Sequence, residues 1–442
     1  MYNKYYIKLN MSADPVSNVG IDSNLKIGQL KASHGPCRRI KHSLTPDSNT
    51  SFNMSDTIRF TLPTRKNTFL VNPNCYLKFK LNNNSDRAII LSHTVNCIID
   101  RVEEYSSGNL LSSVSNYSSL VHMMMDAKYS FSDTVGASNY NGCAAEMDTD
   151  SGGFVSNSSG TPLAIGASKV YAIPVMSSVF GVLLDKYFPL FACTGGDLRL
   201  ELTLNSALRA FYQATGAIPD TDINVSDVSF ELELLECSDQ VMGMVADTVG
   251  NSVLLHSTGF RDYTGTVATG SSGNQVHLIN ARYSSLKSLY TMYLNYNNAH
   301  AAYSTISRVK PISSYQLRIN GGLVPQRPIK DNCQFFLEAL LSIHNDPSSL
   351  MNKGQIPESQ YIANHGDHTG LVSYANKFFA SVPLDSIHGR DSLLMSGIST
   401  LNNPVFTEVE LIGTTATNLF VVNFAEFDVI LQIENGIVKV RF

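Results

Sequence analysis

Apolar and polar side chains alternate along several short segments in the first half of this chain. Residues 198–204 (LRLELTL) alternate without error, and residues 76–81 (YLKFKL) and 228–234 (VSFELEL) follow the same rule. Successive side chains of a β-strand point to opposite faces, so a period of two predicts strands with one buried and one solvent-facing side. Antiparallel sheets tolerate a solvent-facing side. We therefore expect antiparallel sheets here.

The second half of the chain repeats this pattern. Residues 315–319 alternate and are followed by Gly321-Gly322. Residues 427–433 alternate as far as Asn435-Gly436, after which Val438 and Val440 continue the alternation. Asn-Gly between two alternating runs is a strong hairpin signal, because both central residues of the turn need a positive φ. The sequence thus predicts a β-hairpin over the last residues given.

Two segments have apolar residues at helical spacing instead. Residues 110–126 and 331–344 each place apolar side chains three and four positions apart, which predicts one short amphipathic helix in each half. The first includes Met123-Met124-Met125, and methionine at helical spacing is most often a flexible filler of a core.

The predicted elements divide the chain into three parts. Residues 1–54 mix Ser, Asn, Pro and Gly with few periodic apolar positions, which indicates an N-terminal arm. Residues 238–251 carry little signal and separate two blocks of many short strands. The expected fold is all-β: two tandem β-sandwiches, the first over 55–240 and the second over 241–442.

Composition and charge narrow the possible functions. Charged residues are 16% of the 442 residues, below the ~25% of an average soluble protein. The net charge of −5 argues against general binding to polyanions, so contact with nucleic acid would need a local basic patch. The arm carries such a cluster in Arg38, Arg39, Lys41 and His42. It is either a set of solvated charges or a segment that docks under neighbouring subunits or touches an anionic surface.

The cysteines and the apolar segments suggest a protein made and folded inside a cell. The seven cysteines are widely spaced without a C-x-x-C motif, which favours free buried thiols over a disulfide framework or a zinc site. The first residues lack the apolar core of a signal peptide. The most apolar stretch, 170–184, is shorter than the ~20 residues of a membrane span.

Candidate metal ligands occur at two places. His365, Asp367 and His368 are suitable residue types for a divalent metal, but their spacing suits a helix better than a strand, and an exposed loop is the preferred interpretation. Asp220 and Glu231 match part of a calcium-binding loop, in which Val225 stands where glycine is needed. We interpret this second match as accidental.

No catalytic constellation is visible. The motifs G-x-S-x-G, G-x-G-x-x-G and G-x-x-x-x-G-K-[ST] are absent. Glu103-Glu104 are neighbours on a strand and point to opposite faces, whereas Glu231 and Glu233 share a solvent-facing side. The sequence therefore predicts no catalytic, cofactor-binding or metal-binding residue, and a protein that is not an enzyme.

Several segments resemble the double jelly-roll major capsid proteins, most closely those of polinton-like viruses and virophages. Residues 58–63 (IRFTLP) and 74–81 (NCYLKFKL) are similar to their opening strands. Further similar segments are residues 99–102, 107–111, 117–120, 181–190 and 196–202 in the first block, and 284–289, 315–319 and 325–329 in the second. The resemblance covers most of 55–442, although the Trp that relatives often carry before residues 284–287 (SSLK) is missing.

The resemblance implies a structural role in a virion. It implies two eight-stranded jelly rolls per chain, homotrimers that form pseudo-hexameric capsomers, and an icosahedral shell around a DNA genome. The expected partners are further copies of the chain, penton and minor capsid proteins and, through Arg38, Arg39 and Lys41, the genome or an inner membrane.

Two other functions remain open from the sequence. One is a trimeric receptor-binding or lectin-like β-sandwich protein of a virion surface, which a secretion signal and paired cysteines would favour. The other is a metal-dependent jelly-roll enzyme that uses His365, Asp367 and His368.

Overall fold

The structure is a computed structural model. It describes residues 37–91, 94–128, 140, 163–184, 186–212, 218–249, 252–295, 308–344, 356, 361, 377–385, 396–415 and 417–442. Residues 1–36 of the predicted arm lie outside these ranges.

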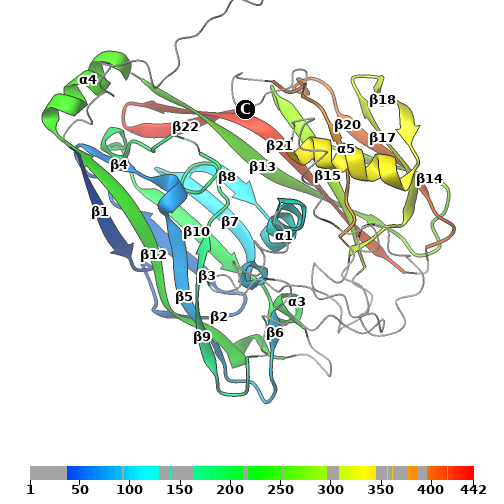
Figure 1. Cartoon of the computed structure of the whole chain (residues 1–442), viewed down its shortest axis with the longest axis horizontal. Coiled ribbons are helices and arrows are strands. Elements are labelled where there is room, and N and C mark those ends of the chain that lie inside the picture. The colour runs from blue at the N-terminus through cyan, green and yellow to red at the C-terminus, as the bar shows by residue number, and fades with distance from the viewer. Residues whose placement is uncertain are drawn as a thin grey trace, which may run out of the picture.

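Two antiparallel sheets form a sandwich in the first half of the chain (Figure 1). Its strands are β1 (Cys37–Leu44), β2 (Ser51–Asn53), β3 (Thr57–Leu62), β4 (Thr68–Leu70), β5 (Tyr76–Asn83), β6 (Ile90–Leu91), β7 (Ile99–Ser106), β8 (Asn109–Val114), β9 (Ser168–Pro174), β10 (Leu198–Leu204), β11 (Phe211–Tyr212) and β12 (Ile223–Cys237). In one sheet, β1 and β2 pair with one edge of β12, β4 and β5 pair with the other, and β9 pairs with β5. The other sheet has the order β3-β10-β7-β8, and β6 and β11 pair with each other in a separate two-stranded sheet.

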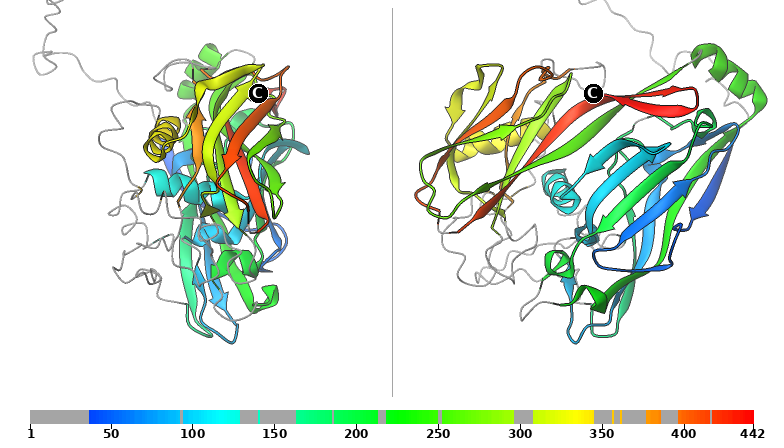
Figure 2. Two further views of the ribbon diagram at one scale, coloured as in Figure 1. Left: turned by 90° about the vertical axis from the view of Figure 1, so that its right-hand side faces the viewer. Right: turned by 180° about the vertical axis from the view of Figure 1, so that it is seen from behind.

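The second half forms another sandwich of the same kind (Figure 2). Its strands are β13 (Val253–Val267), β14 (Asn274–Ile279), β15 (Leu286–Asn295), β16 (Arg308–Val309), β17 (Ile312–Ile319), β18 (Gly322–Ile329), β19 (Ala380–Pro383), β20 (Val405–Leu411), β21 (Leu419–Glu434) and β22 (Ile437–Arg441). One sheet places β21 between β13 and β15, with β16 and β19 on β15 and β22 on β21. The other sheet has the order β14-β20-β17-β18.

The two sandwiches have one connectivity. In each, one long strand (β12 or β21) lies between the first strand of the sandwich (β1 or β13) and a strand that follows later in the chain (β5 or β15). The opposite sheets, β3-β10-β7-β8 and β14-β20-β17-β18, correspond strand for strand. This is the connectivity of a jelly roll, so the predicted tandem all-β fold is confirmed.

Helices connect the strands at several points of the described chain. The α-helices are α1 (Tyr117–Lys128), α3 (Ala207–Ala210), α4 (Asp239–Val249) and α5 (Asn332–His344), and the 3-10 helices are η2 (Asn72–Asn74), η3 (Val95–Ile98), η4 (Leu190–Ala192) and η5 (Asp220–Asp222). The longer helices of the sandwiches, α1 and α5, come at the same point of the repeat, after β8 or β18 and before β9 or β19.

The sequence predicted the second helix correctly and the start of the first one wrongly. Residues 109–114 are strand β8, and α1 begins only at Tyr117. Ser107 and Gly108 both have a positive φ and turn the chain from β7 into β8, a hairpin that the apolar spacing masked. Helix α1 is also not amphipathic, because every residue from Tyr117 to Ala127 is buried.

The predicted arm is also too long. Residues 37–44 and 51–53 are strands β1 and β2, which pair with β12 and complete the first sandwich. Partly buried and exposed residues of β1 alternate only from Ile40 onward, so its pattern is weak. The segment 238–251, which carries little signal in the sequence, contains helix α4, which joins β12 to β13.

Strand β21 shows where simple alternation fails. In β10 the four leucines are buried and the three polar residues between them are partly exposed, as predicted. In β21 every residue from Val421 to Val429 is buried, including Glu426 and Asp428. Asp428, which the alternation over residues 427–433 placed on the solvent-facing side, is covered as well.

The predicted hairpin at Asn435-Gly436 is present and reaches the first sandwich. Asn435 and Gly436 have φ values of 53° and 78°, the pair of positive values that this turn requires. The backbone N–H of Gly195, in the loop before β10, donates to the carbonyl oxygen of Gly436 at 2.9 Å. A Cβ on Gly436 would lie 2.5 Å from the Gly195 nitrogen. The turn therefore needs glycine both for its φ and for this approach.

We expect Gly436→Ala to lower the free energy of unfolding by about 3 kcal/mol, because positive-φ strain adds to the clash with Gly195. Gly321→Ala is the matched control: Gly321 has a φ of 76° in the β17–β18 turn, and a Cβ added there would have no neighbouring atom within 4 Å. It should cost only about 1 kcal/mol. Urea unfolding followed by circular dichroism measures both, and equal losses would mean that the contact with Gly195 adds nothing.

Candidate functional site

The described residues contain no group of three or more His, Cys, Asp or Glu side chains that could hold a metal ion. His365, Asp367 and His368 lie outside the described residues, so the structure does not test them. Within the described part of the chain, no helix is long and apolar enough to cross a membrane.

The two carboxylates of the calcium-like pattern serve separate structural roles. Asp220 accepts hydrogen bonds from the hydroxyl of Ser55 at 2.6 Å and from the backbone N–H of Ala207 at 2.7 Å. Glu231 lies on β12 and accepts from the hydroxyls of Ser43 and Ser229. Each carboxylate joins neighbouring segments of the first sandwich.

Glu103 and Glu104 point to opposite faces of β7, as the sequence predicts. Glu103 is partly exposed, lies 3.5 Å from Arg101 and accepts from Ser113. Glu104 is completely buried and accepts from the hydroxyl of Ser177 and the backbone N–H of Phe180. Burial raises the pKa of Glu104, against the effect of these hydrogen bonds. Glu104 thus ties β7 to the loop around residues 177–180.

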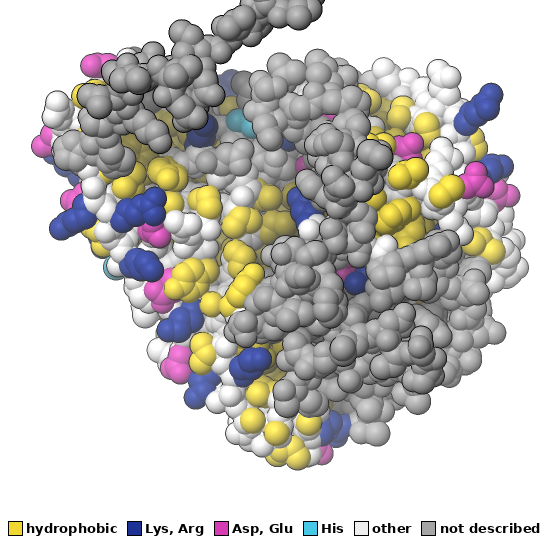
Figure 3. Space-filling model, viewed as in Figure 1, with side chains coloured by type: hydrophobic (Ala, Val, Ile, Leu, Met, Phe, Trp, Pro, Cys, Tyr) yellow, Lys and Arg dark blue, Asp and Glu magenta, His cyan; other side chains and the backbone are white. Residues whose placement is uncertain are grey.

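The basic cluster of β1 is partly neutralised. Arg38 forms an ion pair with Glu236 at 2.6 Å, and Arg39 forms one with Glu233 at 3.0 Å, both glutamates lying on β12. Figure 3 shows Lys and Arg side chains interleaved with Asp and Glu over the first sandwich. These residues do not form a patch of uncompensated positive charge.

The two sandwiches contact each other in a region that we call the joint. Here α1, β8 and the loop 175–184 of the first sandwich meet β13, β16 and the β21–β22 hairpin of the second (Figures 1 and 2). The sequence did not predict the joint, because it is formed by residues far apart along the chain.

A buried charge group crosses the joint. The carboxylate of Asp126, near the end of α1, forms an ion pair with Arg308 of β16, and Lys377 lies 3.5 Å from its other oxygen. The side chains of Asp126 and Arg308 are 0% and 2% exposed. Since an uncompensated buried charge is costly, these groups hold the two sandwiches in one arrangement.

Further hydrogen bonds cross the joint. Asp262 of β13 accepts from the backbone N–H of Ser115 and the side-chain amide of Asn116, both at 3.0 Å, just before α1 begins. Ser257 of β13 donates to the carbonyl oxygen of Ser178 at 2.7 Å. Ser106 accepts from the backbone N–H of Val438 at 3.2 Å. The first sandwich is therefore fastened both to β13 and to the β21–β22 hairpin.

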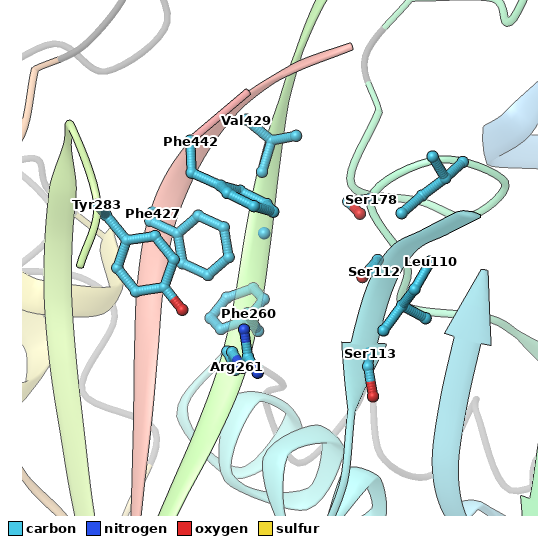
Figure 4. Close-up of a pocket in the computed structure, with 12 residues that line it drawn as sticks. Leu110, Ser112, Ser113, Ser178, Phe260, Arg261, Tyr283, Phe427, Val429 and Phe442 are labelled. Carbon is cyan, nitrogen blue, oxygen red and sulfur yellow. The ribbon is translucent and has the colours of Figure 1, made fainter. Parts of the chain in front are cut away.

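A shallow pocket opens at the joint between β8 and the aromatic end of the second sandwich (Figure 4). Tyr283 stacks on Phe427 with ring centroids 3.8 Å apart, and Phe442 meets both rings edge-on. The volume of the pocket, about 180 Å³, is well below the roughly 300–1,000 Å³ of small-molecule sites. Leu110 and Phe442 at the pocket are exposed. We therefore interpret this pocket as a gap left where the two sandwiches pack, and not as a ligand site.

A second buried charge group lies inside the second sandwich. Asp428 of β21 contacts Lys287 at 2.6 Å and His256 at 2.9 Å, and it accepts a hydrogen bond from Ser285. Burial alone would raise the pKa of Asp428, but the hydrogen bonds from His256, Lys287 and Ser285 outweigh it and lower the pKa to about 2. The carboxylate therefore stays charged in the folded protein at neutral pH.

These charges leave a weak signal in the sequence. Asp126 directly follows Met123-Met124-Met125, and Asp428 interrupts the apolar run of β21. A charge inside an apolar run marks a buried partner, but the sequence does not say which residue pairs with it.

Comparison with known proteins identifies the fold. No protein-family model and no curated protein matches this sequence.

Solved structures do match over nearly the whole chain. The PBCV-1 virus capsid aligns with a TM-score of 0.61 and 11% identity over 94% of this chain and 99% of that chain. The Faustovirus major capsid protein aligns with a TM-score of 0.59 and 8% identity over 93% of each chain. The mavirus major capsid protein aligns with a TM-score of 0.55 and 9% identity over 100% of this chain and 97% of that chain. The chain thus has the double jelly-roll fold that the resemblance implied.

We expect Arg308→Met to lower the free energy of unfolding by about 3–5 kcal/mol, because it leaves the buried charge of Asp126 poorly compensated. The double variant Arg308→Met with Asp126→Asn should recover part of this loss. Arg38→Met, which removes an exposed ion pair, is the control and should cost less than about 1 kcal/mol. Urea unfolding measures all three, and equal losses for Arg308→Met and Arg38→Met would contradict a structural role for the buried pair.

Because of Asp428, we expect the folded protein to lose stability in acid. The pKa of Asp428 is lower in the folded protein than the ordinary value of 3.8, so the unfolded chain binds the proton more tightly. Its contribution, about 2 kcal/mol, is present above about pH 5 and is lost as the pH falls toward 2.

Urea unfolding of the natural protein and of Asp428→Asn between pH 3 and 7 measures this contribution. The difference in the free energy of unfolding between the natural protein and Asp428→Asn should shrink as the pH falls below 4. Asp197→Asn, at an exposed position, controls for the loss of a surface carboxylate. A gap that stays constant with pH would show that Asp428 does not carry the effect.

Proposed function

We propose that this chain is the major capsid protein of an icosahedral virus with a DNA genome. Three copies form a capsomer with a pseudo-hexameric outline, and many capsomers tile the shell of the virion. The observation that carries the proposal is the match of both jelly rolls, in one alignment, to viral capsid proteins over 93% or more of each chain. A likeness of this extent concerns the whole molecule rather than one domain.

The geometry of the chain is suited to a capsomer that repeats across a shell. Two sandwiches of the same connectivity stand side by side, so a threefold arrangement of the chain presents six similar units around its axis (Figure 2). Closed rotational symmetry is the usual way in which identical chains assemble. A joint with buried ion pairs keeps the two units of one chain in a fixed orientation, which a repeating lattice requires.

The residues of the site support a structural role without catalysis. Each of the buried carboxylates Glu104, Asp126 and Asp428 is engaged by hydrogen bonds or ion pairs with its own chain. The partners in this proposal are other copies of the chain together with penton and minor capsid proteins. Contact of the N-terminal segment with a genome or an inner membrane has less support, since Arg38 and Arg39 already pair with glutamates.

Light scattering of the purified chain and electron microscopy test this proposal. We expect particles of three times the 48.4 kDa mass of one chain, with a threefold, six-lobed outline. At high concentration they should form hexagonal sheets or shells. A protein that stays monomeric would rule out the proposed capsomer. A trimer without six lobes that never tiles would instead favour the receptor-binding or lectin-like alternative.

A further inference from the structure

Two cysteines that lie 200 residues apart in the sequence face each other in the first sandwich. Cys37, the first residue of β1, is the direct partner of Cys237, the last residue of β12. Their sulfur atoms are 3.1 Å apart, about 1 Å more than the ~2.04 Å of a disulfide bond. Both are free thiols in the structure. The sequence pattern did not suggest this pair.

The backbone around the pair suits a bond between the two sulfurs. The N–H of Cys237 donates to the carbonyl oxygen of Asn67 at 2.9 Å, on the side of β12 that faces β4. Since the N–H and C=O of one strand residue point to the same side, Cys237 makes no ladder bond to β1. Cys37 and Cys237 are therefore a non-hydrogen-bonded antiparallel pair, in which the Cα atoms are only ~4.5 Å apart and the side chains are closest. This separation falls in the range that disulfides span.

The strand that begins with Cys37 is held on one side only. β1 is an edge strand, and among the described strands it pairs with β12 alone. Its side chains are exposed or partly exposed throughout. The ion pair of Arg38 with Glu236 is exposed and contributes ~0–1 kcal/mol, and Arg39 is itself exposed, although its partner Glu233 is only 12% exposed. Few buried contacts oppose the opening of such a strand.

We propose that Cys37 and Cys237 form a reversible disulfide that locks β1 onto β12. The oxidant is a low-molecular-weight disulfide. The thiolate of Cys37, the more exposed of the two, attacks this disulfide and releases one thiolate; the thiolate of Cys237 then attacks the sulfur of Cys37 and releases the second. The two cysteines lose two electrons and two protons, and the oxidant is reduced to two thiols.

The bond would fix two segments of the chain to each other. Residues 1–36 lead directly into Cys37, and Cys237 lies two residues before α4, which connects the two sandwiches. The disulfide closes a loop of 200 residues, which strongly restricts the unfolded chain. A shell protein assembled in a reducing cell and released into an oxidising medium would meet the two states in turn. This last step alone rests on the proposed function.

The full chain, purified with reductant and then exposed to oxidised glutathione, tests the proposal. Peptide mapping without reductant should find Cys37 joined to Cys237 within a single chain. Trypsin provides a second readout, because its sites after Arg38, Arg39 and Lys41 all lie in β1 and are cut only when the strand opens. Oxidation should slow these cuts at least about tenfold.

Matched variants separate this bond from other thiol chemistry. In Cys37→Ser and Cys237→Ser, which are small changes, cleavage in β1 should no longer respond to the oxidant. Cys333→Ser removes an exposed cysteine elsewhere and should keep the full response. The proposal is overturned if Cys333 reacts with glutathione while no Cys37–Cys237 link forms. It is equally overturned if the link forms and the rate of cleavage in β1 does not change.

Discussion

The arrangement of this molecule depends on charges that are buried between its two halves. Most of β21 is covered on both faces, and α1 is buried on every side. Carboxylates at such places must be paired, since an isolated buried charge costs several kcal/mol. Asp126 finds its partners, Arg308 and Lys377, only when the second sandwich is in place. The ion pairs thus favour one relative orientation over others that would bury similar apolar area.

Much of the fold follows from local patterns in the sequence. The alternation in β10 and β12 and the Asn435-Gly436 turn depend on neighbours along one strand, so the sequence predicts them well. The failures have different causes. The alternation over residues 427–433 placed Asp428 on a solvent-facing side, because the pattern of one strand does not say what covers it. Residues 110–116 were expected to be helical, because their apolar spacing masked the turn at Ser107-Gly108. Strand β1 was missed since only Ile40 and Leu44 give its partly buried face an apolar character.

The candidate site was harder to predict than the fold. The joint and the Cys37–Cys237 pair both unite residues that lie more than 70 positions apart. Single charges within apolar runs, such as Asp126 and Asp428, are a usable hint of buried pairing. Register across a sheet is not visible in the same way, because it is set by the whole pattern of strand pairing. The resemblance to capsid proteins implied the correct fold, but it indicated no residue of the joint.

The buried ion pairs of the joint and the ion pairs of β1 have different structural consequences. The ion pairs of the joint are buried, so salt screens them little and they hold the two jelly rolls as one unit. The ion pair of Arg38 on β1 with Glu236 is exposed, so it is weak and sensitive to salt. A repeating shell needs tiles that keep their shape and edges that can adjust to neighbours. In the proposed capsid role, the joint would keep the shape of the tile fixed, and β1 would adjust to neighbouring chains.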